Sequence, residues 1–203
     1  FAPALLSAFK IPYTGVSSEG LFITTNKILT KNILKTNKIL TPSYYTLNEI
    51  NLLLSDKKYI LKPINEDGSV GLDEDSVFNI QQNNFIEKLK TLSPTEYFIE
   101  EYIDGREFNV SLLGSDENTE ILTPAEIIFK DFPEGKEKVL GYKAKWVDES
   151  FEYKNTVRLF DTLSSDSKLY LKMKNISAQC CKIFGLNGFA RVDFRIDEYE
   201  NIY

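Results

Sequence analysis

The most telling segment of this chain reads Lys62-Pro63-Ile64-Asn65-Glu66-Asp67-Gly68-Ser69-Val70-Gly71. It follows a short apolar run at residues 59–61, which predicts a β-strand. A lysine at a strand end that opens into a loop of small residues is one way to hold phosphate. Gly68 and Gly71 let the backbone approach an anion, so that successive N–H groups can point at its oxygens. Alone, such a loop is more often a simple turn, so the segments that follow decide its interpretation.

The composition is that of a folded protein with an acidic surface. Its 203 residues are enough for one large domain or two small lobes, and 42% of them are hydrophobic. The net charge of −6 argues against sequence-independent binding of nucleic acid, which needs a basic surface. The chain contains no histidine, which excludes histidine-based triads and histidine metal sites. No apolar run approaches the roughly 20 residues that a membrane span requires, so we expect no membrane partner.

The cysteines and the chain ends indicate compartment and completeness. Cys180 and Cys181 are adjacent, a spacing that fits neither a redox motif nor a zinc knuckle. We expect both thiols to be buried and inert in a reducing compartment. Without a signal segment, this favours a cytoplasmic protein. The chain begins without methionine and stops where residues 202–203 would start the return strand of a hairpin, so we expect a fragment of a longer protein.

Hydrophobic periodicity predicts a mixed α+β chain in two lobes that meet near residues 102–105. Helices are expected at residues 3–9, 26–36, 47–54, 77–92 and 168–184. Strands are expected at residues 58–62, 97–103, 106–113, 121–129 and 189–196. Asp104-Gly105 predicts a tight hairpin turn. Residues 132–160 lack clear periodicity and predict a long loop, in which Lys143, Lys145 and Trp146 could close over an anion. A loop held in place by its aromatic residues is the simpler alternative and, for this segment alone, the favoured one.

Two further segments carry groups suited to a nucleotide site. Carboxylates cluster in residues 100–107, where they could accept from an amine or from sugar hydroxyls, although a solvated acidic hairpin is the simpler alternative. Arg191 and Asp193 are two positions apart in a predicted strand, so they share a face. They form either an internal ion pair or a site, because aspartate suits Mg²⁺ and arginine suits phosphate.

Taken in order, these segments resemble the ATP-grasp ligases, and within them the D-alanine–D-alanine ligase group. The matching segments are residues 11–15, 26–27, 62–71, 98–108, 142–146 and 188–195. The resemblance implies an α+β ATP-grasp fold in which two α+β lobes sandwich ATP. It divides the chain into a lead-in at residues 1–23, a central lobe at 24–103 and a C-terminal lobe at 104–203. An N-terminal domain, and a strand with further Mg²⁺ ligands after Tyr203, would lie outside the chain.

The resemblance also implies roles for individual residues. The residues that would bind ATP are Lys27, Lys62, Glu100, Glu101, Ile103 and Glu107. The residues with catalytic roles would be Arg191, Lys145 and Ser69, and Asp193 would bind Mg²⁺. The implied reaction activates a carboxylate as an acyl phosphate, which an amine then attacks; the work of the protein is positioning and electrostatic stabilisation. Partners would be small molecules, and a homodimer of the full-length protein is an option.

Departures from the family pattern at Gly68 and Trp146 leave the substrate open. Dipeptide ligases usually carry two serines in the phosphate loop, where this chain has Gly68-Ser69. The aromatic residue after Lys145 is usually tyrosine, and here it is Trp146. Both changes favour a related ATP-grasp carboxylate–amine ligase with a different substrate over a D-alanine–D-alanine ligase. A nucleotide-binding module without turnover is the third interpretation. Such a module would not require all of Lys62, Glu107, Arg191 and Asp193, so the presence of the full set argues against it.

Overall fold

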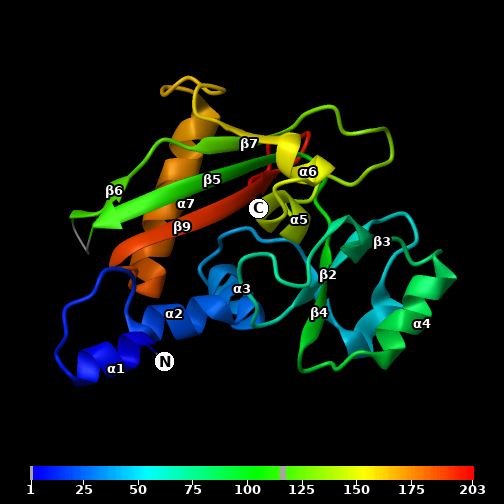
Figure 1. Cartoon of the computed structure of the whole chain (residues 1–203), viewed down its shortest axis with the longest axis horizontal. Helices are drawn as coiled ribbons and strands as arrows, with labels where there is room; N and C mark the ends of the chain where they lie inside the picture. The colour runs from blue at the N-terminus through cyan, green and yellow to red at the C-terminus, as the bar shows by residue number, and fades with distance from the viewer. Residues whose placement is uncertain (1, 115–117) are drawn as a thin grey trace. The chain divides into compact units, whose positions relative to one another are not determined.

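A computed structural model describes residues 2–114 and 118–203 of the chain (Figure 1). Its internal contacts divide the chain into two compact units. Unit 1 comprises Phe1–Leu40, Gly105–Ile127 and Arg158–Tyr203, and unit 2 comprises Thr41–Asp104 and Ile128–Val157. These bounds differ from the lobes expected at residues 24–103 and 104–203, because residues 128–157 fold back onto the glycine-containing loop of unit 2.

Unit 2 is built on a four-stranded antiparallel sheet with strand order β1-β4-β2-β3. Its strands are β1 (Tyr44–Thr46), β2 (Tyr59–Pro63), β3 (Val77–Phe78) and β4 (Tyr97–Glu101). Its helical elements are the 3₁₀ turns η1 (Leu47–Leu52) and η2 (Glu74–Ser76) and the helices α4 (Asn83–Thr91), α5 (Tyr142–Trp146) and α6 (Phe151–Lys154).

Alternation along β2 sends its side chains to two faces of the unit 2 sheet, and Ile60 lies in a small buried cluster on the face opposite the main core. Tyr59 and Leu61 lie in a buried cluster with Leu89 of α4 and Ile99 of β4. Because successive side chains of a strand point to opposite faces, Lys62 lies on the other face. The burial of the apolar face therefore fixes where Lys62 points.

Residues 77–92 were expected to form one helix, and the first part of that prediction is wrong. Val77 and Phe78 form β3, which pairs with Tyr59 and Ile60 of β2, and the helix begins only at Asn83. Phe78 is buried in the core of unit 2, so pairing with β2 outweighs the helical periodicity of the segment.

Unit 1 contains the long antiparallel pair of β5 (Arg106–Gly114) and β9 (Gly188–Ile196), which are in register over nine residue pairs. The shorter strands β6 (Glu120–Ile121), β7 (Ala125–Phe129) and β8 (Thr156–Leu159) extend the sheet, with order β6-β5-β7-β8. The helices are α1 (Ala2–Ala8), α2 (Ser18–Thr25), α3 (Lys27–Thr36) and α7 (Lys168–Phe184).

Helix α7 covers one face of the unit 1 sheet (Figure 1). Its Leu169 and Met173 lie in a buried cluster with Phe108 and Val110 of β5. Cys180 is buried as expected, and burial raises the pKa of its thiol to about 11, which makes it unreactive. Among residues 2–114 and 118–203, none of the helices combines the length and apolar character that crossing a membrane requires.

Three other expectations need correction. Strands β4 and β5 belong to different sheets, so Asp104-Gly105 is a connection and not a hairpin turn. Gly105 is required there because a Cβ atom would lie 2.0 Å from the Ile196 carbonyl oxygen. The strand expected at residues 121–129 is split into β6 and β7 around Pro124, which has no N–H to donate to a ladder. Residues 132–160 contain α5, α6 and β8 and are not irregular throughout.

Candidate functional site

In unit 2, the sheet face that carries Ile60 also carries a charged pair. Lys62 of β2 forms an ion pair with Glu100 of β4. The register pairs Ile60 with Glu100 and Lys62 with Phe98, so the two charged side chains lie diagonally on one face. Glu100 is only 6% exposed, which reduces the screening of this charge pair by solvent. Two of the expected ATP-binding residues are thus brought together.

The next two expected residues lie elsewhere. Glu101 is on the opposite face of β4 from Glu100, and its carboxylate accepts a 2.6 Å hydrogen bond from Lys57 Nζ. That hydrogen bond is the main cause of the raised pKa of Lys57. Ile103 is half-buried in the connection that follows β4. Of the two adjacent glutamates, Glu100 shares a face with Lys62 and Glu101 does not.

The glycine loop, residues 65–72, follows β2 and contains three residues with a left-handed backbone. Gly68, Ser69 and Gly71 have φ angles of +64°, +65° and +70°. Two N–H groups are donated within the loop, that of Val70 to the Asp67 carbonyl oxygen at 3.3 Å and that of Leu72 to the Ser69 carbonyl oxygen at 3.1 Å. Glycine adopts such φ angles without steric cost, whereas Ser69 is a non-glycine residue in a sparsely populated region.

Residues 139–146 lie directly against the glycine loop. Ser69 Oγ donates to the Leu140 carbonyl oxygen at 2.7 Å, and the Tyr142 N–H donates to the Leu72 carbonyl oxygen at 2.8 Å. Gly141 between them allows this approach, since a Cβ there would lie 2.7 Å from the Leu72 oxygen. These contacts hold α5, which carries Lys145, beside the glycine loop.

A cluster of four charged side chains also holds the segment that carries α5. The Glu74 carboxylate lies 3.1 Å from Lys136 Nζ and 3.4 Å from Lys143 Nζ, and Lys136 also pairs with Glu152 at 2.7 Å. Burial alone would raise the Glu74 pKa, but hydrogen bonds from its own backbone N–H and from Lys136, with the two lysine charges, lower it to about 2. This cluster could not be predicted from the sequence, because Glu74 is 62 and 69 residues away from the two lysines that it contacts.

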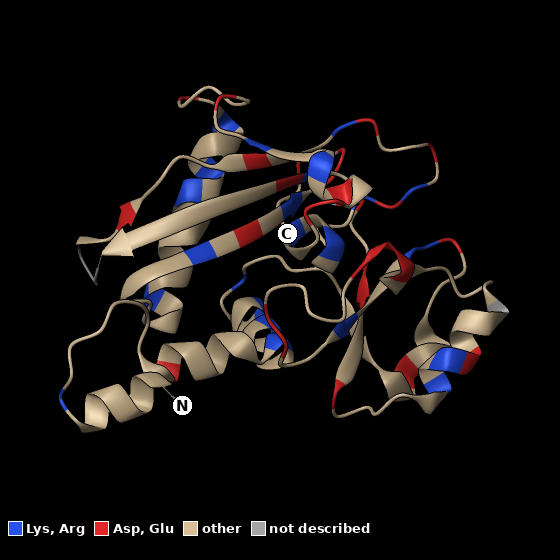
Figure 2. Ribbon diagram, in the orientation of Figure 1, with Lys and Arg blue, Asp and Glu red and all other residues tan. Residues whose placement is uncertain are grey.

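In unit 1, the candidate residues lie on the sheet face opposite α7. The register of β5 and β9 pairs Glu107 with Arg195 and Asn109 with Asp193. Arg195 Nη2 is 2.8 Å from Glu107 Oε2, and Glu107 is 9% exposed. Figure 2 shows acidic and basic bands alternating along β9. The predicted residues of this strand therefore form one continuous polar row.

Arg191 and Asp193 share a face, as the strand period predicted, and form an ion pair. Arg191 donates through Nε to Asp193 Oδ1 at 2.6 Å and through Nη2 to Oδ2 at 2.8 Å. The hydrogen bond to Asp193 raises the pKa of Arg191. Asn109, which the sequence analysis missed, also donates to Asp193 Oδ1, through Nδ2 at 2.9 Å. A mid-strand asparagine gives no local signal, and only the register reveals its neighbour.

The donor set around Asp193 suits a hard divalent cation. Its side chain is 51% exposed, and carboxylate and amide oxygens are ligands that Mg²⁺ accepts. Within residues 2–114 and 118–203 there is no group of three acidic, cysteine or histidine side chains that could hold a metal. Mg²⁺ usually keeps several waters and takes ligands from substrate phosphates, so one or two protein oxygens fit its requirements.

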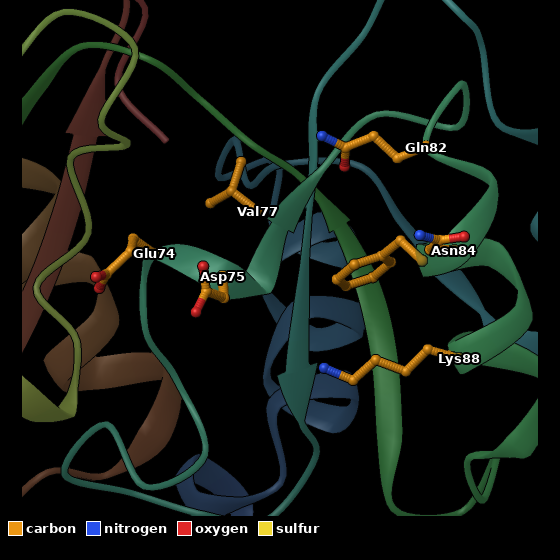
Figure 3. A pocket seen from close by; sticks show the side chains of 7 residues that line it. Glu74, Asp75, Val77, Gln82, Asn84 and Lys88 are labelled. Carbon is orange, nitrogen blue, oxygen red and sulfur yellow. The ribbon is translucent and has the colours of Figure 1, made fainter.

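Lys27 lies at the start of a helix in unit 1, and unit 2 has a surface hollow. Lys27 is the first residue of α3, where the Asn26 side chain caps the helix by accepting from the Leu29 N–H at 2.9 Å. The hollow in unit 2 has a volume of about 380 Å³ (Figure 3). It is lined by Glu74, Asp75, Val77, Gln82, Asn84, Phe85 and Lys88, none of which is a predicted site residue.

Comparisons with known proteins agree on one family. The family model described as "D-ala D-ala ligase C-terminus" matches residues 46–203. A D-alanine–D-alanine ligase from Aquifex aeolicus is 31% identical over 98% of this chain and 63% of its own length. The chain spans 56–63% of the length of the first relatives that it matches.

Solved structures agree with the family match. The D-alanine–D-alanine ligase of Bacillus anthracis has a TM-score of 0.72 and 21% identity, covering 99% of this chain and 62% of that one. The same enzyme complexed with ATP has a TM-score of 0.69 and 20% identity, covering 100% and 60%. The predicted ATP-grasp fold class is confirmed by these neighbours.

Proposed function

Because the chain belongs to the D-ala D-ala ligase C-terminus family, we propose that it contributes the ATP-binding part of an ATP-dependent carboxylate–amine ligase. The proposed reaction forms a C–N bond by way of an acyl phosphate, which an amine attacks. ATP and small carboxylate and amine substrates are the proposed partners, with Mg²⁺ as cofactor. We also propose a cytoplasmic location, where free thiols such as Cys180 stay reduced.

The observation that carries the proposal is the arrangement at the end of β2. Lys62 lies near the end of β2 and precedes a loop in which Gly68, Ser69 and Gly71 are left-handed. The Lys62 ammonium group is suited to phosphate oxygens, and the two glycines let the backbone come close to them. A nucleotide with its phosphates at this loop would bring its base toward the face of β4 that carries Glu100.

The proposed roles of the other residues follow from the chemistry of each group. Lys27 and Lys62 would contact phosphates, while Glu100 and the backbone of Ile103 would bind the base. Glu107 would accept from ribose hydroxyls. Glu101, paired with Lys57, would support the nucleotide site from the far face of β4.

The residues proposed for the chemical step act on developing charge. Arg191, with its planar fork of donors, would stabilise charge on the transferring phosphoryl group. Lys145 on α5 and Ser69 in the glycine loop would add donors around the phosphates. Asp193 would hold Mg²⁺, which when bound neutralises charge on phosphate oxygens.

The contact between Gly68 and Trp146 supports a second candidate: the same reaction with a substrate other than D-alanine. The Trp146 indole N–H donates to the Gly68 carbonyl oxygen at 2.8 Å. A tryptophan against a glycine gives this part of the loop a different shape from a tyrosine against a serine. A pocket wall with a changed shape is expected to select different substrates.

A phosphate-release assay tests both candidates. The full-length protein is given ATP, Mg²⁺ and either D-alanine or a panel of amino acids and dipeptides, with Arg191→Ala as the control for background ATPase activity. Phosphate release with D-alanine, with formation of the dipeptide, supports a D-alanine–D-alanine ligase. Release with another pair supports the second candidate. If the protein binds ATP but no pair stimulates release, the ligase proposal is wrong.

A further inference from the structure

We propose that Asn109 is a positioning residue for Asp193, holding one carboxylate oxygen so that the other faces a divalent cation. The inference rests on the proposed function, in which Asp193 binds Mg²⁺. It adds a residue from a neighbouring strand to the site, and it assigns different tasks to the two oxygens of Asp193.

The two oxygens of the Asp193 carboxylate have different hydrogen-bond partners. Oδ1 accepts from Arg191 Nε at 2.6 Å and from Asn109 Nδ2 at 2.9 Å. Oδ2 accepts from Arg191 Nη2 at 2.8 Å. Arg191 therefore holds both oxygens, whereas Asn109 holds Oδ1 alone.

The two oxygens of Asp193 also differ in their remaining capacity. Among the described residues, Oδ1 accepts two hydrogen bonds, from Arg191 and Asn109, whereas Oδ2 accepts one. The pair with Asp193 uses two of the five N–H donors of Arg191, so three remain for a phosphate. A cation therefore finds its open lone pair on Oδ2, while Arg191 and Asn109 hold Oδ1.

Asn109 is much more buried than the carboxylate that it contacts. The residue is 4% exposed, whereas the Asp193 side chain is 51% exposed. A buried donor on a strand that is paired over its whole length is rigid, so its hydrogen bond orients the mobile carboxylate.

The side-chain oxygen of Asn109 also supports this role. Asn109 Oδ1 is buried and has no hydrogen-bond partner within residues 2–114 and 118–203. Native proteins seldom leave such an oxygen without a donor. Water bound to Mg²⁺ is a donor of the kind that would arrive with the cation, because Mg²⁺ usually keeps several of its waters. The amide would then contact both Asp193 and the hydration shell of the cation.

The test measures metal affinity apart from nucleotide affinity. Mn²⁺ binding is followed by electron paramagnetic resonance in the presence of ADP, and ADP binding is followed by calorimetry in EDTA. Asn109→Leu, similar in volume without polar atoms, is compared with Asn109→Thr, whose hydroxyl is too short to reach Asp193. The matched control is Ser111→Ala, an exposed position two residues along the same face of β5.

Both Asn109 variants are expected to bind Mn²⁺ about 10- to 100-fold more weakly, the usual effect of losing a group that orients a metal ligand. Their ADP affinity in EDTA should stay within about twofold of the wild type, and Ser111→Ala should change neither. Wild-type Mn²⁺ affinity in the Asn109 variants overturns the inference and leaves the proposed function intact. If both variants unfold, or lose ADP binding in EDTA to the same extent as Mn²⁺ binding, Asn109 is structural and the inference is wrong. If the wild-type protein binds ADP without any dependence on Mn²⁺, the metal part of the proposed function fails as well.

Discussion

The indole N–H of Trp146 donates a 2.8 Å hydrogen bond to the carbonyl oxygen of Gly68. These are two of the positions at which the sequence was expected to depart from the usual pattern of the dipeptide ligases. A Cβ atom at Gly68 would lie 3.7 Å from Cζ2 of the indole, so the ring rests against the space that a side chain would enter. The two departures therefore form one paired contact between α5 and the glycine loop.

Replacing Trp146 by phenylalanine should loosen residues 132–160 without unfolding the protein. The change removes one hydrogen bond, worth about 1 kcal/mol, and keeps an aromatic ring. Hydrogen exchange should become faster in residues 139–146, with the rest of unit 2 unchanged. Tyr142→Phe, in the same short helix, is the matched control and should have little effect. Equal exchange rates in Trp146→Phe and wild type would show that this contact does not hold the segment.

Trp146 also provides a direct probe of ligand binding, because it is the single tryptophan of the chain. The indole lies on the glycine loop, so a nucleotide with its phosphates at that loop should change its surroundings. We expect the emission of Trp146 to shift or change intensity when an ATP analogue and Mg²⁺ are added. Emission that stays constant at saturating nucleotide, with binding verified by calorimetry, would contradict both the location of the phosphates and the predicted movement of this segment.

Gly141 should be the least replaceable glycine of this region. A Cβ there would lie 2.7 Å from the Leu72 oxygen and 2.9 Å from Asp73 Cα, and neither backbone atom can move aside easily. Gly141→Ala is expected to destabilise unit 2 by about 1–3 kcal/mol, as for other overpacked sites. Gly135→Ala is the control, since a Cβ at Gly135 meets no atom within 4 Å and costs only the strain of its φ of +82°. Urea unfolding of both variants tests this, and equal stabilities would contradict it.

The parts of the fold that were predicted have signals within their own sequence. The helix expected at residues 168–184 is present with those bounds, because an apolar stripe that includes Met173 and Phe184 is flanked by two caps. Ser167 accepts from the Tyr170 N–H at its start, and Gly185 adopts a φ of 57° at its end. Strand β3 has only two residues, and it exists because β2 offers it a partner.

The candidate site shows the same difference between features with a signal in their own segment and features that depend on a partner strand. That Arg191 and Asp193 share a face follows from the two-residue period of a strand, and their contact confirms it. The pairing of Lys62 with Glu100 and of Asn109 with Asp193 depends on the register between strands that are distant in sequence. Register is set by which faces become buried, so it could not be predicted from either strand alone.

Acid should weaken the anchoring of residues 136–143 through Glu74. Its folded-state pKa of about 2 lies below its ordinary value of 4.5, so its ionised form contributes stability that is fully present above about pH 4.5. This contribution is lost as the pH falls toward 2. The difference in unfolding free energy between wild type and Glu74→Gln should be constant above pH 5 and shrink below it. Glu87→Gln, in an exposed pair with Lys90, is the control and should show a smaller difference throughout.

Lys62 should be required for nucleotide binding in a way that a neighbouring lysine is not. Lys62→Ala removes a charge-assisted bond to phosphate, so ATP affinity should fall roughly ten- to a hundredfold. It also removes the ammonium paired with the buried Glu100, so unfolding in urea should become easier by about 1–3 kcal/mol.

Lys58→Ala is the matched control for this change, because Lys58 precedes the same strand and pairs with Glu137 while remaining half exposed. We expect unchanged ATP affinity and a stability loss below about 1 kcal/mol, as is usual for exposed ion pairs. Calorimetric titration of ATP into folded Lys62→Ala decides the matter. Affinity equal to that of the wild type would mean that Lys62 serves only to pair with Glu100, and that the phosphates bind elsewhere.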